Sequence, residues 1–154
     1  MATYTKKTVA DAPQSDTMKV SEDKGNVEVH TVGKINREIY KCIADDIRTE
    51  EVIITDERIE HIQERRGKEF YIRYSSLFCE ILQEPDYIFK DKREHTALVC
   101  KRVVEDGKYV NVVLRIAIEA DNPEYKNSII TAIGESEKRF AQRLRNNIAL
   151  YKKE

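Results

Sequence analysis

The sequence lacks several features that would assign it to a specialised class of protein. All of its hydrophobic runs are shorter than the roughly 18 residues needed to cross a bilayer, so no membrane span is expected. The three cysteines, Cys42, Cys79 and Cys100, have no CxxC spacing, and each stands among apolar neighbours. They therefore indicate neither a disulfide framework nor a zinc site, and we expect buried thiols in a reducing compartment.

Neither sign of charge is in excess, although charged residues make up 36% of the chain. The 27 basic and 28 acidic residues leave a formal net charge of -1, which argues against a uniformly basic nucleic-acid coat but allows a local basic patch. The N-terminus lacks the apolar segment of a signal peptide, and no internal repeat is visible. A chain of 154 residues with this composition is expected to form one compact cytoplasmic domain.

The chain divides into an arm and a folded domain. Residues 1–30 are rich in Thr, Ser, Asp and Lys, which predicts a flexible N-terminal arm, with an edge strand through "NVEVH" as the alternative. The folded domain is expected over residues 31–154. Helical spacing predicts helices over residues 33–43, 56–67 and 70–83. The second of these starts after the N-cap residue Thr55 and ends near Gly67.

After Pro85 the apolar residues alternate, which is typical of strands. The predicted strands are "DYIF", "TALVCKRVV", "YVNVVLRIAIE" and "NSIITAI", followed by a helix in "SEKRFAQRLRNN" and a closing strand in "IALYKK". The predicted fold is therefore α+β, with N-terminal helices packed on one face of a curved antiparallel sheet of about four strands.

The strand "YVNVVLRIAIE" predicts which face of the sheet is open. Its even positions are all apolar and should face the helices, which leaves Asn111 and Arg115 on the other face. A two-residue turn before this strand would place Lys101 opposite Val112 in the core, whereas a three-residue loop would place it opposite Asn111. Because burying an unpaired lysine costs several kcal/mol, we predict the second register, with Lys101, Asn111 and Arg115 on the open face.

The segment "RIEHIQERRGKE" places a histidine among arginines on a helix with little apolar surface. His61 has Arg58 three residues before it and Arg65 four residues after it, so the three side chains share one helical face. Two neighbouring guanidinium groups favour the neutral imidazole, which is the form that acts as a general base. An ordinary surface histidine on a charged helix is the alternative.

Several motifs occur in an order that resembles a known family. They are "VGKINREIYKCI", "VIITDERIEHIQERR", "EILQEPDYIFKDKREHTALVCK", "VNVVLRIA", "YKNSIITAI" and "RLRNNIALYKKE". Together they resemble the phage-encoded barnase, EndoU, colicin and RelE-like nuclease family over residues 31–154. The resemblance implies a metal-independent ribonuclease site without a cofactor, on the sheet face opposite the helices.

The resemblance also implies roles for individual residues. Its catalytic positions are matched by His61, Lys101, Arg115 and Thr131. The residues expected to contact RNA are Arg65, Arg66, Asn111, Tyr151 and Lys152. One position departs from the family, whose helix reads "HIxERH", because Arg66 stands where the second histidine would be. His95 is a weaker candidate for the missing imidazole.

Two functions follow from these residues. The first is a phage or mobile-element ribonuclease that cleaves RNA, with tRNA as one candidate, by acid–base attack of the 2′-hydroxyl. Such an enzyme would act as a toxin or host-takeover effector in the cytoplasm of a bacterial host. The alternative is a nuclease-fold domain that has lost an imidazole and binds RNA or a host protein, for instance as an inhibitor of host defence.

Overall fold

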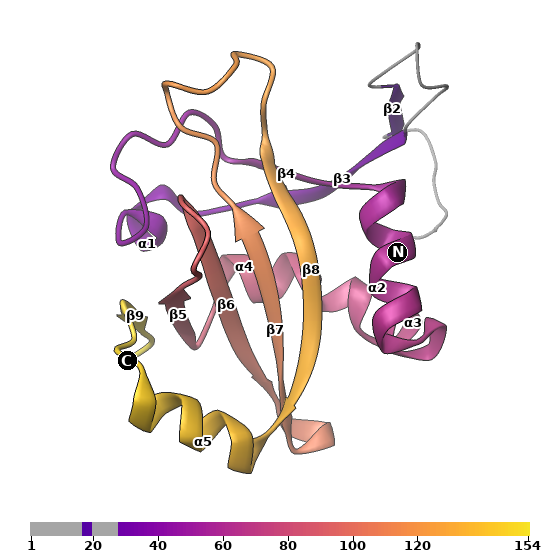
Figure 1. The fold of residues 1–154 in the computed structure, drawn as a ribbon, viewed down its shortest axis with the longest axis vertical. Coiled ribbons are helices and arrows are strands. Elements are labelled where there is room, and N and C mark those ends of the chain that lie inside the picture. Colours follow the sequence, from indigo (N-terminus) through magenta and orange to yellow (C-terminus); the bar gives the residue numbers. More distant parts are fainter. Residues whose placement is uncertain (1–16, 20–27) are drawn as a thin grey trace.

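The computed structural model describes residues 17–19 and 28–154 (Figure 1). The elements with their bounds are β2 (Thr17–Lys19), β3 (Glu28–Lys34), α1 (Arg37–Tyr40), β4 (Glu51–Thr55), α2 (Asp56–Arg66), α3 (Lys68–Tyr74), η1 (Ser75–Leu77), α4 (Phe78–Gln83), β5 (Tyr87–Lys90), β6 (Thr96–Val103), η2 (Val104–Asp106), β7 (Lys108–Arg115), β8 (Asn127–Ser136), α5 (Glu137–Asn146) and β9 (Tyr151–Lys152). Among these residues no helix has the length and apolarity that a membrane crossing requires.

The predicted architecture of N-terminal helices on an antiparallel sheet of about four strands is wrong. The structure is α+β, but its sheet is mixed and has eight strands in the order β2-β3-β4-β8-β7-β6-β5-β9. The additional strands come from the N-terminal part of the chain, and β4 pairs with β8 in parallel. The helices are short, and α5 follows the last long strand instead of joining the others (Figure 1).

Two of the predicted N-terminal helices differ from the structure in extent. The segment 33–43 holds the end of β3 and only a four-residue helix, α1, because a strand occupies its first residues. The segment 70–83 is divided into α3, η1 and α4. The predicted helix with His61 is confirmed as α2: the Thr55 hydroxyl accepts from Arg58 N at 3.2 Å, and Gly67 ends the helix at φ 99°.

The predicted arm over residues 1–30 falls mostly outside the residues that the structure describes. Of its described residues, 17–19 form β2 and 28–30 begin β3, which contains the last three residues of "NVEVH". Strand β3 pairs antiparallel with both β2 and β4.

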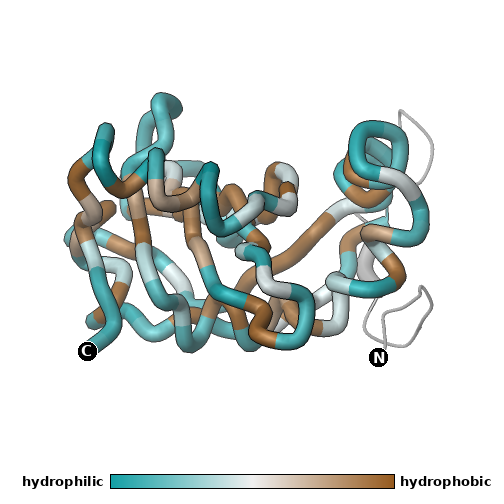
Figure 2. Tube along the Cα trace, turned by 90° about the horizontal axis from the view of Figure 1, so that it is seen from below, coloured by the Kyte–Doolittle hydropathy of each residue, from teal (hydrophilic) through white to brown (hydrophobic). Residues whose placement is uncertain are grey.

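The sheet has two unlike faces. Alternation along β7 directs Val110, Val112 and Leu114 to the face where α2, α3 and α4 pack, and we call this the helical face. The largest buried cluster lies there and includes Ile62 of α2 and Ile81 of α4. The opposite face, which we call the α5 face, carries a smaller cluster built around Phe140 of α5. Figure 2 shows hydrophobic stretches alternating with hydrophilic ones along the chain, with hydrophilic residues prevailing in the loops.

The hairpin between β6 and β7 has a register that neither sequence alternative described. Lys101 pairs with Val110, so the loop contains four residues, Val104 to Gly107, and both predicted turns are too short. Gly107 does supply the expected left-handed conformation, at φ 60°. Asp106 fixes the longer loop to α3 because it accepts hydrogen bonds from Arg73 and Tyr74. The predicted gathering of Lys101 with Asn111 on one face is therefore wrong.

Candidate active site

Two polar side chains on the α5 face, those of Asn111 and Thr131, each have one buried atom without a hydrogen-bond partner among the described residues. Asn111 is 0% exposed, and its Nδ2 donates to Glu135 Oε1 at 2.8 Å. Asn111 Oδ1 and Thr131 Oγ1 are both buried, and neither has a hydrogen-bond partner within the described part of the chain. Thr131 pairs with Val113, two residues from Asn111 on β7, so the two atoms belong to one region of the face. Buried polar atoms normally have partners, so these two oxygens stand out among the polar atoms of the described residues.

An ion pair between the buried Glu135 and the half-buried Arg143 lies beside Asn111. Glu135 of β8 is 8% exposed, and its two carboxylate oxygens accept from Arg143 Nε at 3.1 Å and Nη2 at 2.8 Å. Burial raises the pKa of Glu135, but hydrogen bonds from Arg143 and Asn111 outweigh it and leave the pKa below its ordinary value. The pair ties α5 to β8 and turns the Asn111 amide so that Nδ2 faces Glu135.

Glu135 was not among the predicted site residues, because the predicted strand ends at Ile133. In the structure β8 continues to Ser136, which brings Glu135 opposite Tyr109. The alternation of the strand itself carried a weak signal, because Glu135 has the same parity as Thr131 and Ile133.

Arg115 lies on the α5 face as predicted, and an acidic partner holds it there. Its guanidinium donates to both carboxylate oxygens of Asp121, at 3.1 and 3.2 Å, and also to the Ile116 carbonyl. The bond from Arg115, together with one from the Ile118 backbone N–H, lowers the pKa of Asp121. The carboxylate of Asp121 therefore neutralises part of the positive charge that Arg115 brings to this region.

His95 lies at the same end of the sheet as Arg115. It immediately precedes Thr96, which pairs with Arg115, and its carbonyl accepts from Ile116 N at 2.8 Å. Its backbone has φ 54°, an uncommon conformation for a residue other than glycine. After the bonds from Arg115 and Ile118, His95 is a further group that lowers the pKa of Asp121, so His95 lies near the Arg115–Asp121 pair.

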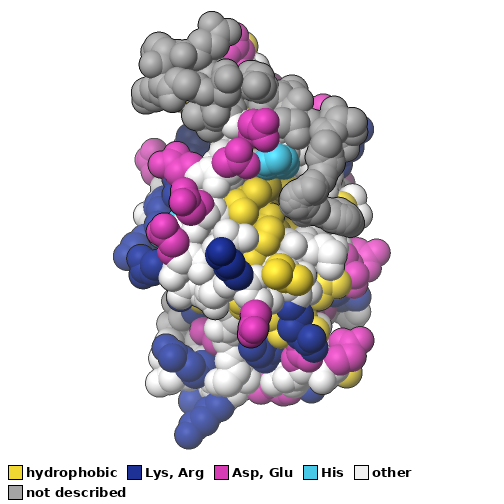
Figure 3. Space-filling view, turned by 90° about the vertical axis from the view of Figure 1, so that its right-hand side faces the viewer, with side chains coloured by type: hydrophobic (Ala, Val, Ile, Leu, Met, Phe, Trp, Pro, Cys, Tyr) yellow, Lys and Arg dark blue, Asp and Glu magenta, His cyan; other side chains and the backbone are white. Residues whose placement is uncertain are grey.

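Helix α2 brings other predicted residues to the edge of β8. Arg66 Nε donates to the Ala132 carbonyl at 3.2 Å, so Arg66 lies against the backbone of β8 at the residue that follows Thr131. His61 is half-buried and makes no hydrogen bond or ion pair with the described residues, and Arg65 is exposed. Figure 3 shows this side of the molecule, where a strip of hydrophobic side chains runs between acidic side chains and Lys and Arg side chains.

Three predicted residues lie apart from this region. Lys101 is on the helical face, and its Nζ donates to the Glu84 carbonyl at 2.8 Å. Tyr151 and Lys152 are in β9, which is separated from β8 by β5, β6 and β7. Four strand spacings correspond to roughly 19 Å, so β9 cannot share one reacting phosphate with Thr131.

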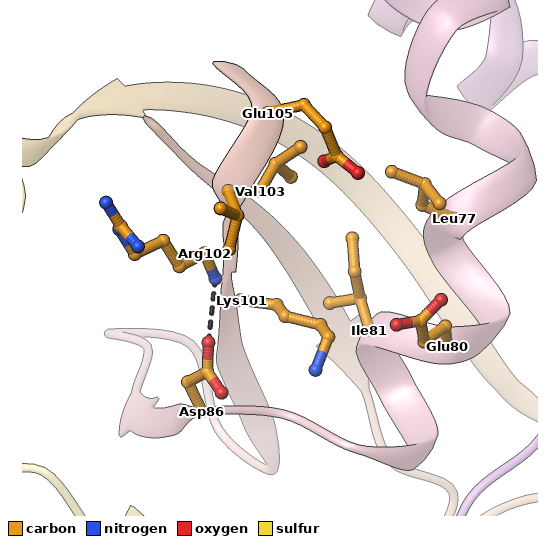
Figure 4. Close-up of a pocket in the computed structure, with 9 residues that line it drawn as sticks. Leu77, Glu80, Ile81, Asp86, Lys101, Arg102, Val103 and Glu105 are labelled. Atoms are coloured by element: carbon orange, nitrogen blue, oxygen red, sulfur yellow. Dashed lines mark hydrogen bonds between the residues drawn. The ribbon is translucent and has the colours of Figure 1, made fainter. Parts of the chain in front are cut away.

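The surroundings of Lys101 form a cavity of their own, of about 480 Å³. It lies between α4 and the β6–β7 hairpin, with Leu77 and Ile81 as apolar walls (Figure 4). The carboxylates of Glu80 and Glu105 also face this cavity. An anionic phosphate would meet them there, which disfavours this cavity as the cleavage site.

One group of side chains in the described part of the chain has the composition of a metal site. Glu28, His30 and Asp56 place one ligand atom each within 4.8 Å of one another. His30 Nε2 and Asp56 Oδ1 are already joined by a hydrogen bond of 2.6 Å. This bond accounts for the closest contact of the group, and we assign no metal to it.

The described residues form an α+β domain with a polar region on the α5 face. Residues 27–152 match the family described as phage-Barnase-EndoU-ColicinE5/D-RelE like nuclease2, and the chain belongs to this family. The resemblance seen in the sequence is thereby confirmed. No curated protein and no solved structure matches the chain.

Proposed function

We propose that the chain is a ribonuclease whose reaction takes place on the α5 face. The observation that carries the proposal is the pair of buried, unpaired oxygen atoms, Asn111 Oδ1 and Thr131 Oγ1, with Arg115 and Arg66 close by. A phosphodiester and its ribose 2′-hydroxyl would complete these groups: the hydroxyl of Thr131 can donate to a phosphate oxygen, and Asn111 Oδ1 can accept from a ribose hydroxyl.

The chemistry needs a base, an acid and cations for the developing charge. His61 would remove the proton of the 2′-hydroxyl, and the resulting oxygen attacks phosphorus. The bond from phosphorus to the 5′-oxygen then breaks, and a protonated His95 would give that oxygen its proton. The products are a 2′,3′-cyclic phosphate and a 5′-hydroxyl, and Arg115 and Arg66 would stabilise the pentavalent phosphate between them.

The remaining predicted residues have unequal parts in this proposal. Arg65 and Lys152 are exposed and would contact phosphates farther along the same RNA. Tyr151 has no part, because it pairs with Ile88 and packs against the cluster of the helical face. Lys101 has no part, because it lies on the helical face. A tRNA substrate, and a role as a phage toxin or host-takeover effector in the bacterial cytoplasm, remain consistent with such a site.

A domain that binds RNA or a host protein without cleavage is the second candidate. Two observations favour it. The guanidinium of Arg115 already forms an ion pair with Asp121, and Arg66 stands where the family's second histidine would be. RNA binding must then compete with Asp121 for Arg115.

The test is to incubate the wild-type protein, His61→Ala and His95→Ala with total tRNA in EDTA and to analyse the product ends. We expect wild-type cleavage with 2′,3′-cyclic phosphate ends and a loss of about 10²-fold or more in each variant. RNA binding without cleavage by the wild type would overturn the proposal in favour of the second candidate. Cleavage abolished by EDTA would contradict the metal-independent mechanism.

A further inference from the structure

A second cavity, which we call the hollow, lies on the α5 face, at the end of the sheet far from α2. It has a volume of about 530 Å³ and lies between β5, β6 and the C-terminal end of α5. The residues that line it are Phe89, Lys90, Asp91, Lys92, Leu98, Arg143 and Asn147. We propose that this hollow binds a nucleobase of single-stranded RNA, next to the nucleotide whose phosphate reacts at Thr131. The proposal rests on the ribonuclease function proposed above.

The hollow and the proposed reaction site share one row of the sheet. Phe89 pairs with Leu98, Leu98 pairs with Val113, and Val113 pairs with Thr131. Residues in such a cross-strand row point to the same face, so the row runs straight from the hollow to Thr131. Three strand spacings amount to roughly 14 Å, a span within reach of the neighbouring nucleotides of one strand.

The charges around the hollow favour a polyanion. Lys90 Nζ bonds only to backbone carbonyls, those of Asp91 and Arg93, and Lys92 is exposed and has no partner among the described residues. The one carboxylate in the lining, Asp91, is bound by Arg93 through Nη1 at 2.8 Å and through the backbone N–H at 3.0 Å. Lys90 pairs with Ala97 and therefore points toward the helical face, so Lys92 is the lysine whose uncompensated ammonium group would attract a phosphate beside a bound base.

The walls of the hollow also suit a base. Phe89 and Leu98 are 3% and 8% exposed and form an apolar floor. Asn147, at the C-terminal cap of α5, donates through Nδ2 to the Arg143 carbonyl at 3.1 Å. Its Oδ1 accepts no hydrogen bond from the described residues, so it can accept from an N–H at the edge of a base. An apolar floor with an aromatic ring and a flanking cation are parts from which single-strand binding sites are built.

The test uses binding of a 2′-O-methyl hexanucleotide, which cannot be cleaved, so that recognition is separated from reaction. Six versions, each with one abasic position, would be titrated against the wild type, Asn147→Ala and Lys92→Glu. Lys68→Glu is the matched control, because Lys68 is also exposed but lies on α3, at the other side of the sheet. Thermal melts of all variants would confirm that each is folded.

We expect one abasic position to weaken wild-type binding by about fivefold or more, and Asn147→Ala to remove this dependence on the base. Lys92→Glu should weaken binding of the intact hexanucleotide by about tenfold and reduce its salt dependence, whereas Lys68→Glu should change it by less than twofold. Equal binding of all abasic versions, or the same weakening by Lys68→Glu, would overturn the base site. If the wild type cleaves tRNA in that case, the ribonuclease function stands; if it neither binds nor cleaves RNA, both proposals fall.

Discussion

The two faces of the central sheet differ in what they bury. The helical face is covered by a continuous apolar cluster from Ile35 to Ala132, and the side chains that β7 contributes to it are all aliphatic. The α5 face buries a smaller aromatic cluster, in which the rings of Tyr109 and Phe140 stack at 3.7 Å. Beside this cluster lie Asn111 and Glu135, two of the few buried polar side chains in the described part of the chain.

This difference separates stability from function. An apolar face lowers the free energy of the folded state without offering groups to a ligand. Buried polar atoms without partners have the opposite effect, since they cost stability and are retained where a ligand completes them. The helical face therefore holds the domain together, and the α5 face is where we place the chemistry.

The largest expected effect on stability comes from the helical face. Leu114→Ala removes a side chain that is 0% exposed and should lower the free energy of unfolding by about 2–5 kcal/mol. Its neighbour Val113 points to the α5 face and is smaller, so Val113→Ala should cost less. Urea denaturation of both variants measures the difference. Equal losses would contradict the unequal roles of the two faces.

A second stability effect concerns the hairpin that closes the helical face. Hydrogen bonds from Arg73 and Tyr74 lower the pKa of Asp106 to about 2. Because the folded pKa lies below the unfolded one, this contribution is present above about pH 4 and is lost as the pH falls toward about 2. The urea midpoint of wild type should therefore exceed that of Asp106→Asn at pH 7 and converge with it at the acid end. Parallel pH profiles would exclude this role of Asp106.

The smallest stability effect is expected on the α5 face. Thr131→Val replaces a buried hydroxyl that has no partner by a methyl group of similar shape, so the free energy of unfolding should change by less than about 1 kcal/mol. RNA cleavage should nevertheless fall by about tenfold or more. Thr31→Val, on the exposed part of β3, is the control for both measurements. A variant that keeps full activity would remove Thr131 from the site.

Local patterns in the sequence predicted the ends of α2 and the two faces of β7. Thr55 and Gly67 mark the two ends of α2 because capping depends on residues within one turn of the helix. Alternation along β7 correctly placed Arg115 and Asn111 on one face and the even positions on the other. The order of the motifs was sufficient to identify the family, because several motifs that are unspecific alone occur together over most of the chain.

Non-local pairing could not be predicted in the same way. Val52 of β4 pairs with Asn127 of β8, and no local periodicity encodes such a parallel contact. The position of Lys101 depended on the length of one loop, and the anchoring of Asp106 to Arg73 and Tyr74 made that loop longer than common hairpin turns. The Glu135–Arg143 ion pair forms because α5 packs against β8. The sequence of α5 is rich in basic residues and did not indicate that one of them, Arg143, contacts the sheet.

The measurement that tests the central claim most directly is the RNA cleavage rate of Arg115→Ala beside that of Lys101→Ala, in EDTA. The two residues belong to neighbouring strands but to opposite faces of the sheet. We expect Arg115→Ala to lower kcat/KM by about 10²–10³-fold, as loss of a group that stabilises transition-state charge does. Lys101→Ala should stay within about twofold of wild type. A severe loss of kcat/KM in Lys101→Ala, together with full activity in Arg115→Ala, would indicate a site on the helical face and contradict the placement of the reaction on the α5 face.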